Sequence, residues 1–146
     1  MKLDLAIVLE ASQELGLQHF FDATTFIDNL LHLFDISPGG THVHIVLYSR
    51  IARSIISFDQ LFFQSSEAVA AILHYLTPDL ALRPFPFLIS GKRLDIALQY
   101  VNDHVFTAER GDRPDAENVA VFVTDGVIQF GQDHDISETV SSLKVR

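Results

Sequence analysis

The sequence of 146 residues predicts an α/β fold, in which an open, mostly parallel sheet carries helices on both faces. Three continuous apolar segments, at 3–10, 41–49 and 118–126, have the composition of strands buried on both faces of a parallel sheet. Amphipathic helical segments alternate with them. A short fourth strand follows the second one too closely for a parallel crossover, so it is expected to pair antiparallel at an edge.

The first strand, "LDLAIVLE" (3–10), is apolar apart from Asp4. The segment "HFFDATTFIDNLLHLFD" (19–35) follows and predicts a helix that ends at "SPGG" (37–40), because proline and glycine terminate helices. Its predicted apolar stripe consists of Phe20, Ile27, Leu31 and Phe34, with Phe26, Leu30 and Leu33 beside it.

The second strand, "THVHIVLYS" (41–49), is followed after a very short link by "RSIISFD" (53–59), which predicts an antiparallel hairpin. A helix is expected over "SSEAVAAILHYLTP" (65–78), with a serine cap, the early acid Glu67 and a proline stop. The prolines at 84 and 86 make 79–91 a long loop.

The segment 93–111 predicts a helix whose stripe is Leu94, Leu98, Val101 and Val105, with Gly111 after its end. The third buried strand, "NVAVFVTDG" (118–126), ends in an acid and a glycine. Asp135 and Glu138 form a capping pattern for a last helix that runs to residue 146.

Composition limits the classes of function. The chain is 48% hydrophobic, which suits one globular domain over 1–146, and no apolar run is long enough to span a membrane. The absence of cysteine rules out disulfides and thiolate metal sites. A net charge of -9 disfavours nucleic acid as a partner. Met1 and Lys2 lead directly into a strand, so this sequence carries no signal peptide, which indicates an intracellular protein or an excised piece.

Three stretches carry a family resemblance, namely "DLAIVLEAS", "GGTHVHIVLYSRIARSIISFD" and "GKRLDIALQYVNDHVFTAERGDRPDAENVAVFVTDG". They resemble the von Willebrand factor type A domain, especially the domains of collagens and other matrix proteins. The resemblance implies a mostly parallel sheet with one antiparallel edge strand, and a non-enzymatic role in adhesion or protein interaction outside the cell. The family normally continues beyond the helix at 135–146, so the resemblance also implies a domain that is incomplete at its C-terminus.

Many members of this family bind a divalent cation at a metal-ion-dependent adhesion site (MIDAS), through an Asp-x-Ser-x-Ser loop, a threonine and a later aspartate. By resemblance, the loop positions fall on Glu10, Ser12 and Glu14, and the late aspartate on Asp125. The threonine position falls on Lys92. Carboxylates attract hard cations such as magnesium, manganese or calcium, but three altered positions out of five indicate a degenerate site.

Lys92 gives this site an alternative to a metal ion. Three carboxylates about 6 Å apart, at an effective dielectric constant near 20, repel one another by about 8 kcal/mol in all. One ammonium near their centre returns an attraction of similar size, so Lys92 is expected to act as an internal counter-ion and to lie within salt-bridge distance of Glu10, Glu14 or Asp125. A metal-free site is the favoured interpretation; a bound divalent cation, with Ser90 supplying the hydroxyl, is the alternative.

The leading hypothesis is an extracellular module that binds a matrix or cell-surface protein through the carboxyl edge of the sheet. Its rivals are an intracellular scaffold domain of the same fold and an α/β enzyme that uses the acids at the strand ends. His42 and His44 point the same way on a strand, but packed or hydrogen-bonded histidines are expected there rather than zinc ligands. The expected partner-binding residues are Ser12, Glu14, Lys92 and Asp125, with Phe85 and Phe87 in the rim loop 82–90.

Overall fold

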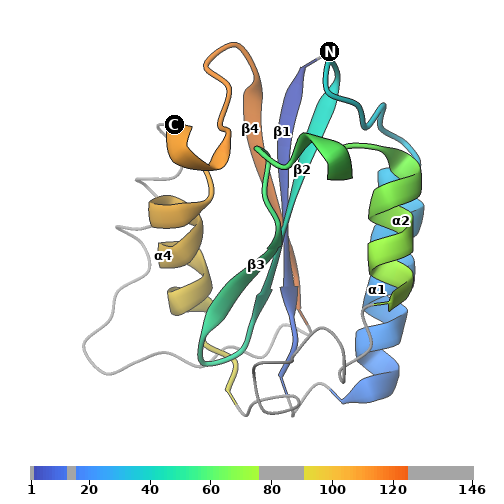
Figure 1. Cartoon of the computed structure of the whole chain (residues 1–146). Coiled ribbons are helices and arrows are strands. Elements are labelled where there is room, and N and C mark those ends of the chain that lie inside the picture. The colour runs from blue at the N-terminus through green and yellow to red at the C-terminus, as the bar shows by residue number, and fades with distance from the viewer. Residues whose placement is uncertain (1, 13–15, 76–90, 125–146) are drawn as a thin grey trace.

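The computed structural model describes residues 2–12, 16–75 and 91–124. Its four strands, β1 (Leu3–Glu10), β2 (Thr41–Tyr48), β3 (Ala52–Ile56) and β4 (Glu117–Val123), form one sheet in the order β3-β2-β1-β4 (Figure 1). β1 pairs in parallel with both β2 and β4, and β3 pairs antiparallel with β2. The predicted mixed sheet with one antiparallel edge strand is therefore confirmed.

Helices cover both faces of the sheet, as predicted. α1 (Leu17–Leu31) and α2 (Ser66–Tyr75) pack on one face, and α4 (Leu94–His104) packs on the other (Figure 1). Two short 3-10 turns, η1 (Leu61–Phe63) and η2 (Ala108–Arg110), lie near the amino ends of β1, β2 and β4. No helix among the described residues is long and apolar enough to cross a membrane.

Every residue of β1 and β2 is buried, because alternate side chains of each strand enter two separate cores. Odd-numbered residues of both strands face α1 and α2, and even-numbered residues face α4. The first core includes Leu5, Ile7, Ile45, Leu47, Phe20, Ile27, Val69 and Leu73; the second includes Ala6, Val8, Val46, Phe58, Ala97, Val101 and Val105.

α1 is shorter than predicted. It ends at Leu31, and the next residues bond three positions back, from Leu33 N to Leu30 O and from Phe34 N to Leu31 O. This tightening turns the chain toward the 37–40 segment, and Phe34 still packs against the core as predicted although it lies beyond the helix. Leu33 is 79% exposed and Phe26 is 54% exposed, so both were wrongly placed beside the core.

α4 also ends earlier than predicted, at His104 rather than near Gly111. The following residues form a buried turn and η2, which brings the Arg110 carbonyl within 3.0 Å of the Asp59 backbone nitrogen. Gly111 has φ 92°, and a Cβ there would lie 2.5 Å from that same nitrogen. The close passage over Asp59, which a continued helix would prevent, explains the early end.

The helix caps and sheet edges match the remaining expectations in part. Ser65 Oγ accepts a hydrogen bond from Ala68 N at 3.1 Å, which confirms the serine cap of α2.

β4 is only partly buried, with Val119 39% exposed, because it is the outermost strand of the described sheet. The prediction of a fully buried strand was wrong. The predicted loop at 79–91, apart from Gly91, and the helix at 135–146 lie outside the described residues.

Candidate functional site at the carboxyl end of the sheet

The strand order reverses between β1 and β4, and that is where open α/β sheets bind ligands. From β1 the chain moves outward to β2 and β3, and it then returns to place β4 on the other side of β1. Leu9 pairs with Val123, so the residues that come next, Glu10 and Thr124, lie side by side at the carboxyl ends of the two strands. The predicted position of Glu10 at this edge is confirmed.

Glu10 is fully buried, and both of its carboxylate oxygens are engaged. Oε2 accepts a hydrogen bond from Ser12 Oγ at 2.5 Å and lies 3.1 Å from Lys92 Nζ. Oε1 accepts a hydrogen bond from Thr124 Oγ1 at 2.6 Å. Ser12 is fully buried and Lys92 is 4% exposed, so the ion pair is screened from solvent. Two hydroxyls and one ammonium together satisfy the buried carboxylate.

Lys92 reaches this position because the backbone before α4 lies directly against the hairpin turn between β2 and β3. Arg93 N donates to Ser49 O at 3.0 Å. Gly91 has φ 125°, and a Cβ there would lie 2.8 Å from Arg50 Cβ. Only glycine accommodates both the close approach and the backbone conformation, so Gly91 fixes where the lysine enters the site.

The loop after β1 is tied to the same hairpin, since Ala11 N donates to Tyr48 O at 2.7 Å. Ser12 is thereby held within hydrogen-bonding distance of the Glu10 carboxylate. The sequence predicted that the Lys92 ammonium would lie within salt-bridge distance of an acid at this edge, and the 3.1 Å contact with Glu10 places it there. Glu10, Ser12 and Lys92 are therefore brought together as expected.

A second ion pair at the start of α4 was not predicted. Arg93 binds Asp95 with two parallel hydrogen bonds, from Nε to Oδ1 at 2.9 Å and from Nη2 to Oδ2 at 2.7 Å. Asp95 is buried, whereas the Arg93 side chain is 31% exposed. The hydrogen bonds to Asp95 raise the pKa of Arg93 above its usual value. The signal in the sequence was an acid two residues after a base at a helix start.

Thr124 was also missed as a partner of Glu10. The family resemblance pointed to the acid that follows it, Asp125, and left the threonine as part of the strand end. Its position directly after β4, opposite the end of β1, was the available signal. Glu14, Asp125, Phe85 and Phe87, which the sequence also proposed for this edge, lie outside the described residues.

The described residues do not fit a divalent cation beside Glu10. A cation at Oε2 would compete with the Lys92 ammonium for the same oxygen, and two like charges in a buried site repel strongly. Among residues 2–12, 16–75 and 91–124, no group of three or more His, Cys, Asp or Glu side chains is placed to hold a metal ion. The donor set around Glu10 is instead that of a buried carboxylate with an internal counter-ion.

His42 and His44 are packed and hydrogen-bonded, as expected for histidines under a helix. His42 Nε2 lies 2.7 Å from Pro38 O, and His44 Nε2 lies 2.6 Å from Ser54 Oγ. His44 also stacks edge-on against Phe58, with ring centroids 5.1 Å apart. Burial, and secondarily the nearby positive charge of Arg110, lower the pKa of His44 to about 3.

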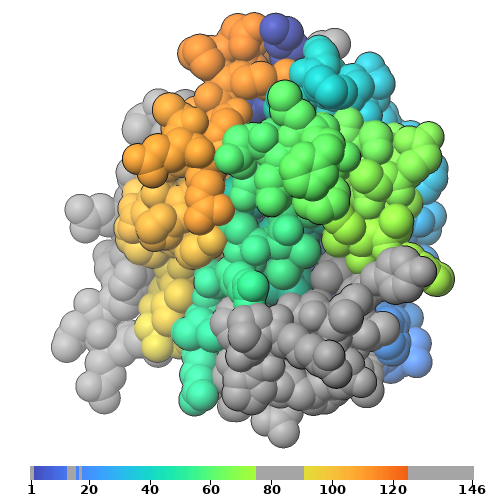
Figure 2. Space-filling view, in the orientation of Figure 1, coloured from blue at the N-terminus to red at the C-terminus, as the bar shows by residue number. Residues whose placement is uncertain are grey.

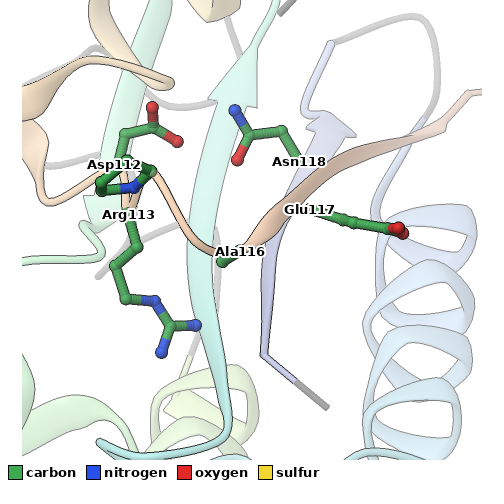
Figure 3. A pocket seen from close by; sticks show the side chains of 6 residues that line it. Asp112, Arg113, Ala116, Glu117 and Asn118 are labelled. Carbon is green, nitrogen blue, oxygen red and sulfur yellow. The ribbon is translucent and has the colours of Figure 1, made fainter.

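The opposite end of the sheet contains a shallow hollow lined by the loop before β4 and the first residues of that strand (Figure 3). Glu117 points away from the loop, and Arg113 extends to the opposite side from Asp112. The Arg113 guanidinium is engaged by the buried Asp4, with Nη2 2.8 Å from Oδ1. This hollow lies at the amino ends of β1 and β4, away from the strand ends at which Glu10 and Thr124 meet.

Comparisons with known proteins agree with this architecture. Rat (Rattus norvegicus) von Willebrand factor is 32% identical over 124 residues, which cover 84% of this chain and 26% of that protein. Human (Homo sapiens) matrilin-3 is 28% identical over 127 residues, which cover 85% of this chain and 24% of that protein. The chain thus spans about a quarter of the length of these two relatives.

Solved structures show the same fold. Proximal thread matrix protein 1 from the mussel byssus, in a structure described as having a zinc occupied MIDAS motif, superposes with a TM-score of 0.82 at 15% identity. The match covers 99% of this chain and 36% of that one. A family model described as the von Willebrand factor type A domain matches residues 4–146. The chain therefore belongs to the von Willebrand factor type A domain family.

Proposed function

We propose that this chain is a non-enzymatic protein-interaction module of the adhesion or extracellular-matrix type, which binds another protein through the carboxyl edge of its sheet. In this proposal the MIDAS is degenerate, and Lys92 takes the place of the divalent cation. The observation that carries the proposal is the buried ion pair between Lys92 Nζ and Glu10 Oε2 at 3.1 Å. The relatives named von Willebrand factor, matrilin and thread matrix protein support the extracellular setting.

The burial of the ion pair determines which residues of the carboxyl edge can contact a partner. Ser12 and Lys92 are 0% and 4% exposed, so a partner cannot reach them without displacing their neighbours. We therefore assign them a positioning part: they neutralise Glu10 and hold the loop after β1, the hairpin turn and the start of α4 together. Exposed residues on those segments make the contact, and Glu14, Asp125, Phe85 and Phe87 remain proposed members of the rim.

The proposal is tested by binding to a panel of immobilised purified matrix and cell-surface proteins, in buffer with magnesium and in buffer with EDTA. We expect binding to at least one member that is equal in the two buffers, because Lys92 supplies the positive charge that a cation otherwise supplies. Binding that disappears in EDTA contradicts the metal-free site.

Two matched variants locate the binding surface. Ile51, in the hairpin turn, is 37% exposed, and Phe62, in η1 at the other end of the sheet, is 75% exposed. Ile51→Ser is expected to weaken binding and Phe62→Ser to leave it unchanged, because an exposed apolar side chain contributes only where the partner covers it. The reverse result places the interaction at the amino end and overturns the proposal.

A further inference from the structure

Positive charge is concentrated at one end of an otherwise acidic chain. The described residues contain seven of its ten Lys and Arg residues, namely 2, 50, 53, 92, 93, 110 and 113. Four of these seven, at 50, 53, 92 and 93, lie on the hairpin turn, the start of β3 and the start of α4. Two acids, Glu10 and Asp95, pair with Lys92 and Arg93, so the four cations less these two acids leave an excess of two positive charges on these described segments, in a chain whose net charge is -9.

Three of these four cations are at least partly exposed: Arg53 is half-buried on β3, and Arg50 and Arg93 lie on the two segments that backbone contacts join. The Lys92 side chain is 5% exposed and is neutralised by Glu10, whereas Arg50 is exposed and the Arg93 side chain is 31% exposed. Figure 2 shows the hairpin as a projecting part of the surface, with the start of α4 close to it. A partner at this edge therefore meets two guanidinium groups before it meets the buried ammonium.

Backbone contacts hold the two arginines on adjacent segments. Arg93 N donates to Ser49 O, which places residue 93 beside the residue that precedes Arg50. Gly91 packs against Arg50 so closely that a Cβ on the glycine would lie 2.8 Å from the Arg50 Cβ. The surface therefore combines residues that are more than forty positions apart in the sequence, on a rigidly joined pair of segments.

Arg93 is also oriented in advance. The two hydrogen bonds to the buried Asp95 use Nε and one Nη2 proton, and a guanidinium has five N–H donors in a fixed plane. Asp95 thus fixes the plane of the guanidinium and leaves further N–H groups for a second acceptor. Fixing a side chain before binding reduces the entropy that is lost on association.

We propose that the partner presents an acidic peptide segment, whose carboxylates bind Arg50 and Arg93. Guanidinium groups pair with carboxylates through two parallel hydrogen bonds, which suits a fixed arginine. Ile51, 37% exposed next to Arg50, adds an apolar contact that the side chains of a peptide can cover and a sulfated polysaccharide cannot. This inference rests on the proposed function, since it names the chemistry of the partner at the same edge.

The test measures fluorescence anisotropy of a labelled oligoglutamate peptide with the whole chain at low salt. We expect binding that weakens as salt is added. The double substitution Arg50→Gln with Arg93→Gln is expected to weaken it by about tenfold or more, because charge-assisted hydrogen bonds are lost. Arg93→Lys, which keeps the charge but not the planar fork, is expected to fall between the two.

Lys2→Gln is the matched control, because it removes one exposed cation at the opposite end of the sheet, where Lys2 pairs with Asp115 at 2.7 Å. Its binding is expected to equal that of the unmodified chain, and thermal melting of each variant checks that it is folded. Equal binding by the double variant and the unmodified chain overturns the inference. So does binding of dextran sulfate, dependent on Arg50 and Arg93, in the absence of oligoglutamate binding.

Failure of this inference can be told from failure of the proposed function. If oligoglutamate does not bind but Ile51→Ser still weakens binding to a matrix protein, the carboxyl edge is the interaction surface and only its preference for acidic segments is wrong. If Ile51→Ser has no effect on any bound protein while Phe62→Ser does, the proposed function itself fails.

Discussion

β1 carries one buried acid at each end, and the two acids are held in different ways. Asp4 and Glu10 are both 0% exposed and both lie on the face of the sheet that α4 covers. Asp4 pairs with Arg113 at the amino end, and Glu10 pairs with Lys92 at the carboxyl end. β1 thus contributes the acid of a buried ion pair at each of its two ends, one with an arginine and one with a lysine.

The amino-end pair joins three segments rigidly. Arg113 donates to Asp4 from its backbone nitrogen at 2.7 Å and from Nε at 2.8 Å. Its Nη2 also donates to the carbonyl oxygens of Leu3 at 3.0 Å and Gly40 at 2.8 Å. A planar guanidinium with several fixed acceptors can adopt only one arrangement. This pair stabilises the starts of β1 and β2 and the loop before β4.

The carboxyl-end pair uses a flexible lysine and two hydroxyl groups instead. Lys92 contributes a point charge on a four-carbon chain, and Ser12 and Thr124 complete the hydrogen bonds of Glu10. Hydroxyls rotate and an ammonium has no preferred plane, so this arrangement tolerates small shifts of the surrounding loops. Of the two ion pairs of β1, the rigid one therefore lies away from the edge that we propose for binding, where the fixed pair of Arg93 with Asp95 belongs to the start of α4 and not to the strand.

The largest expected effect is at the rigid end. Arg113→Met removes the counter-ion of the fully buried Asp4 and leaves the Gly40 carbonyl without this donor. Removal of one partner from a buried ion pair costs about 3–5 kcal/mol, so urea denaturation should show a loss of that size. Lys2→Met, at an exposed ion pair, is the matched control and should change stability little. A loss no larger than that control would refute the structural role.

Lys92→Met should produce the next largest effect, and one that differs in kind. It keeps the apolar stem but leaves Glu10 buried without a counter-ion, at a cost of about 3 kcal/mol. Magnesium or manganese should then recover part of the loss, about 1.4 kcal/mol at ten times the dissociation constant. Thermal melting with and without metal measures both the loss of stability on substitution and the part of it that the metal recovers.

Controls for this experiment come from the comparison itself. The unmodified chain and Arg113→Met should not respond to magnesium, since the first has Lys92 in place and the second is altered at the other end. Stabilisation of the unmodified chain by magnesium would show that Lys92 and a cation can occupy the site together. That result would contradict the counter-ion interpretation.

Sequence patterns predicted β1 and β2 well, because burial on both faces leaves a continuous apolar run that few other structures produce. The end of α4 could not be predicted, since it depends on a contact with a distant segment. α4 ends at His104, and the chain after it turns so that the Arg110 carbonyl accepts a hydrogen bond from the backbone nitrogen of Asp59, a residue about fifty positions earlier. Helical periodicity contains no information about such a contact.

The candidate site was predicted only as far as single positions allow. Glu10 and Lys92 have opposite charges and both map onto family ligand positions, so their ion pair could be anticipated. Thr124 and the pair of Arg93 with Asp95 could not, because a hydroxyl after a strand and an acid near a helix start are common in any α/β chain. Their roles follow from the register of β1 with β4 and from the burial of Asp95.

Between the two charged ends lies a neutral polar group whose effect depends on pH. The pKa of His44 is lowered by burial and by Arg110 to about 3, from 6.5 in the unfolded chain, so the folded state keeps the ring neutral. The stabilising effect is fully present above pH 6.5 and is lost as the pH falls toward 3. Within that window the free energy of unfolding should decrease by about 1.4 kcal/mol per pH unit from this group alone.

His44→Gln provides the comparison, because glutamine does not titrate and its amide can still bond to Ser54 Oγ. Urea denaturation between pH 7 and pH 4.5 should give a flatter pH dependence for the variant than for the unmodified chain. Parallel pH profiles for the two proteins would show that folding does not lower the pKa of His44.

The smallest expected effect separates the hydroxyls from the lysine at the carboxyl end. Thr124→Val is isosteric and removes the 2.6 Å hydrogen bond to Glu10 Oε1. Thr124 is exposed, so water can replace part of the interaction, and a loss of about 1 kcal/mol is expected by urea denaturation. Thr124→Ser keeps the hydroxyl and should retain most of the stability. If Thr124→Val costs more than Lys92→Met, the hydroxyl that links β1 to β4 holds Glu10 more firmly than its counter-ion does. The contrast between a rigid arginine pair and an adaptable lysine pair would then have to be redrawn as a contrast between an ion pair and a hydrogen-bonded carboxylate.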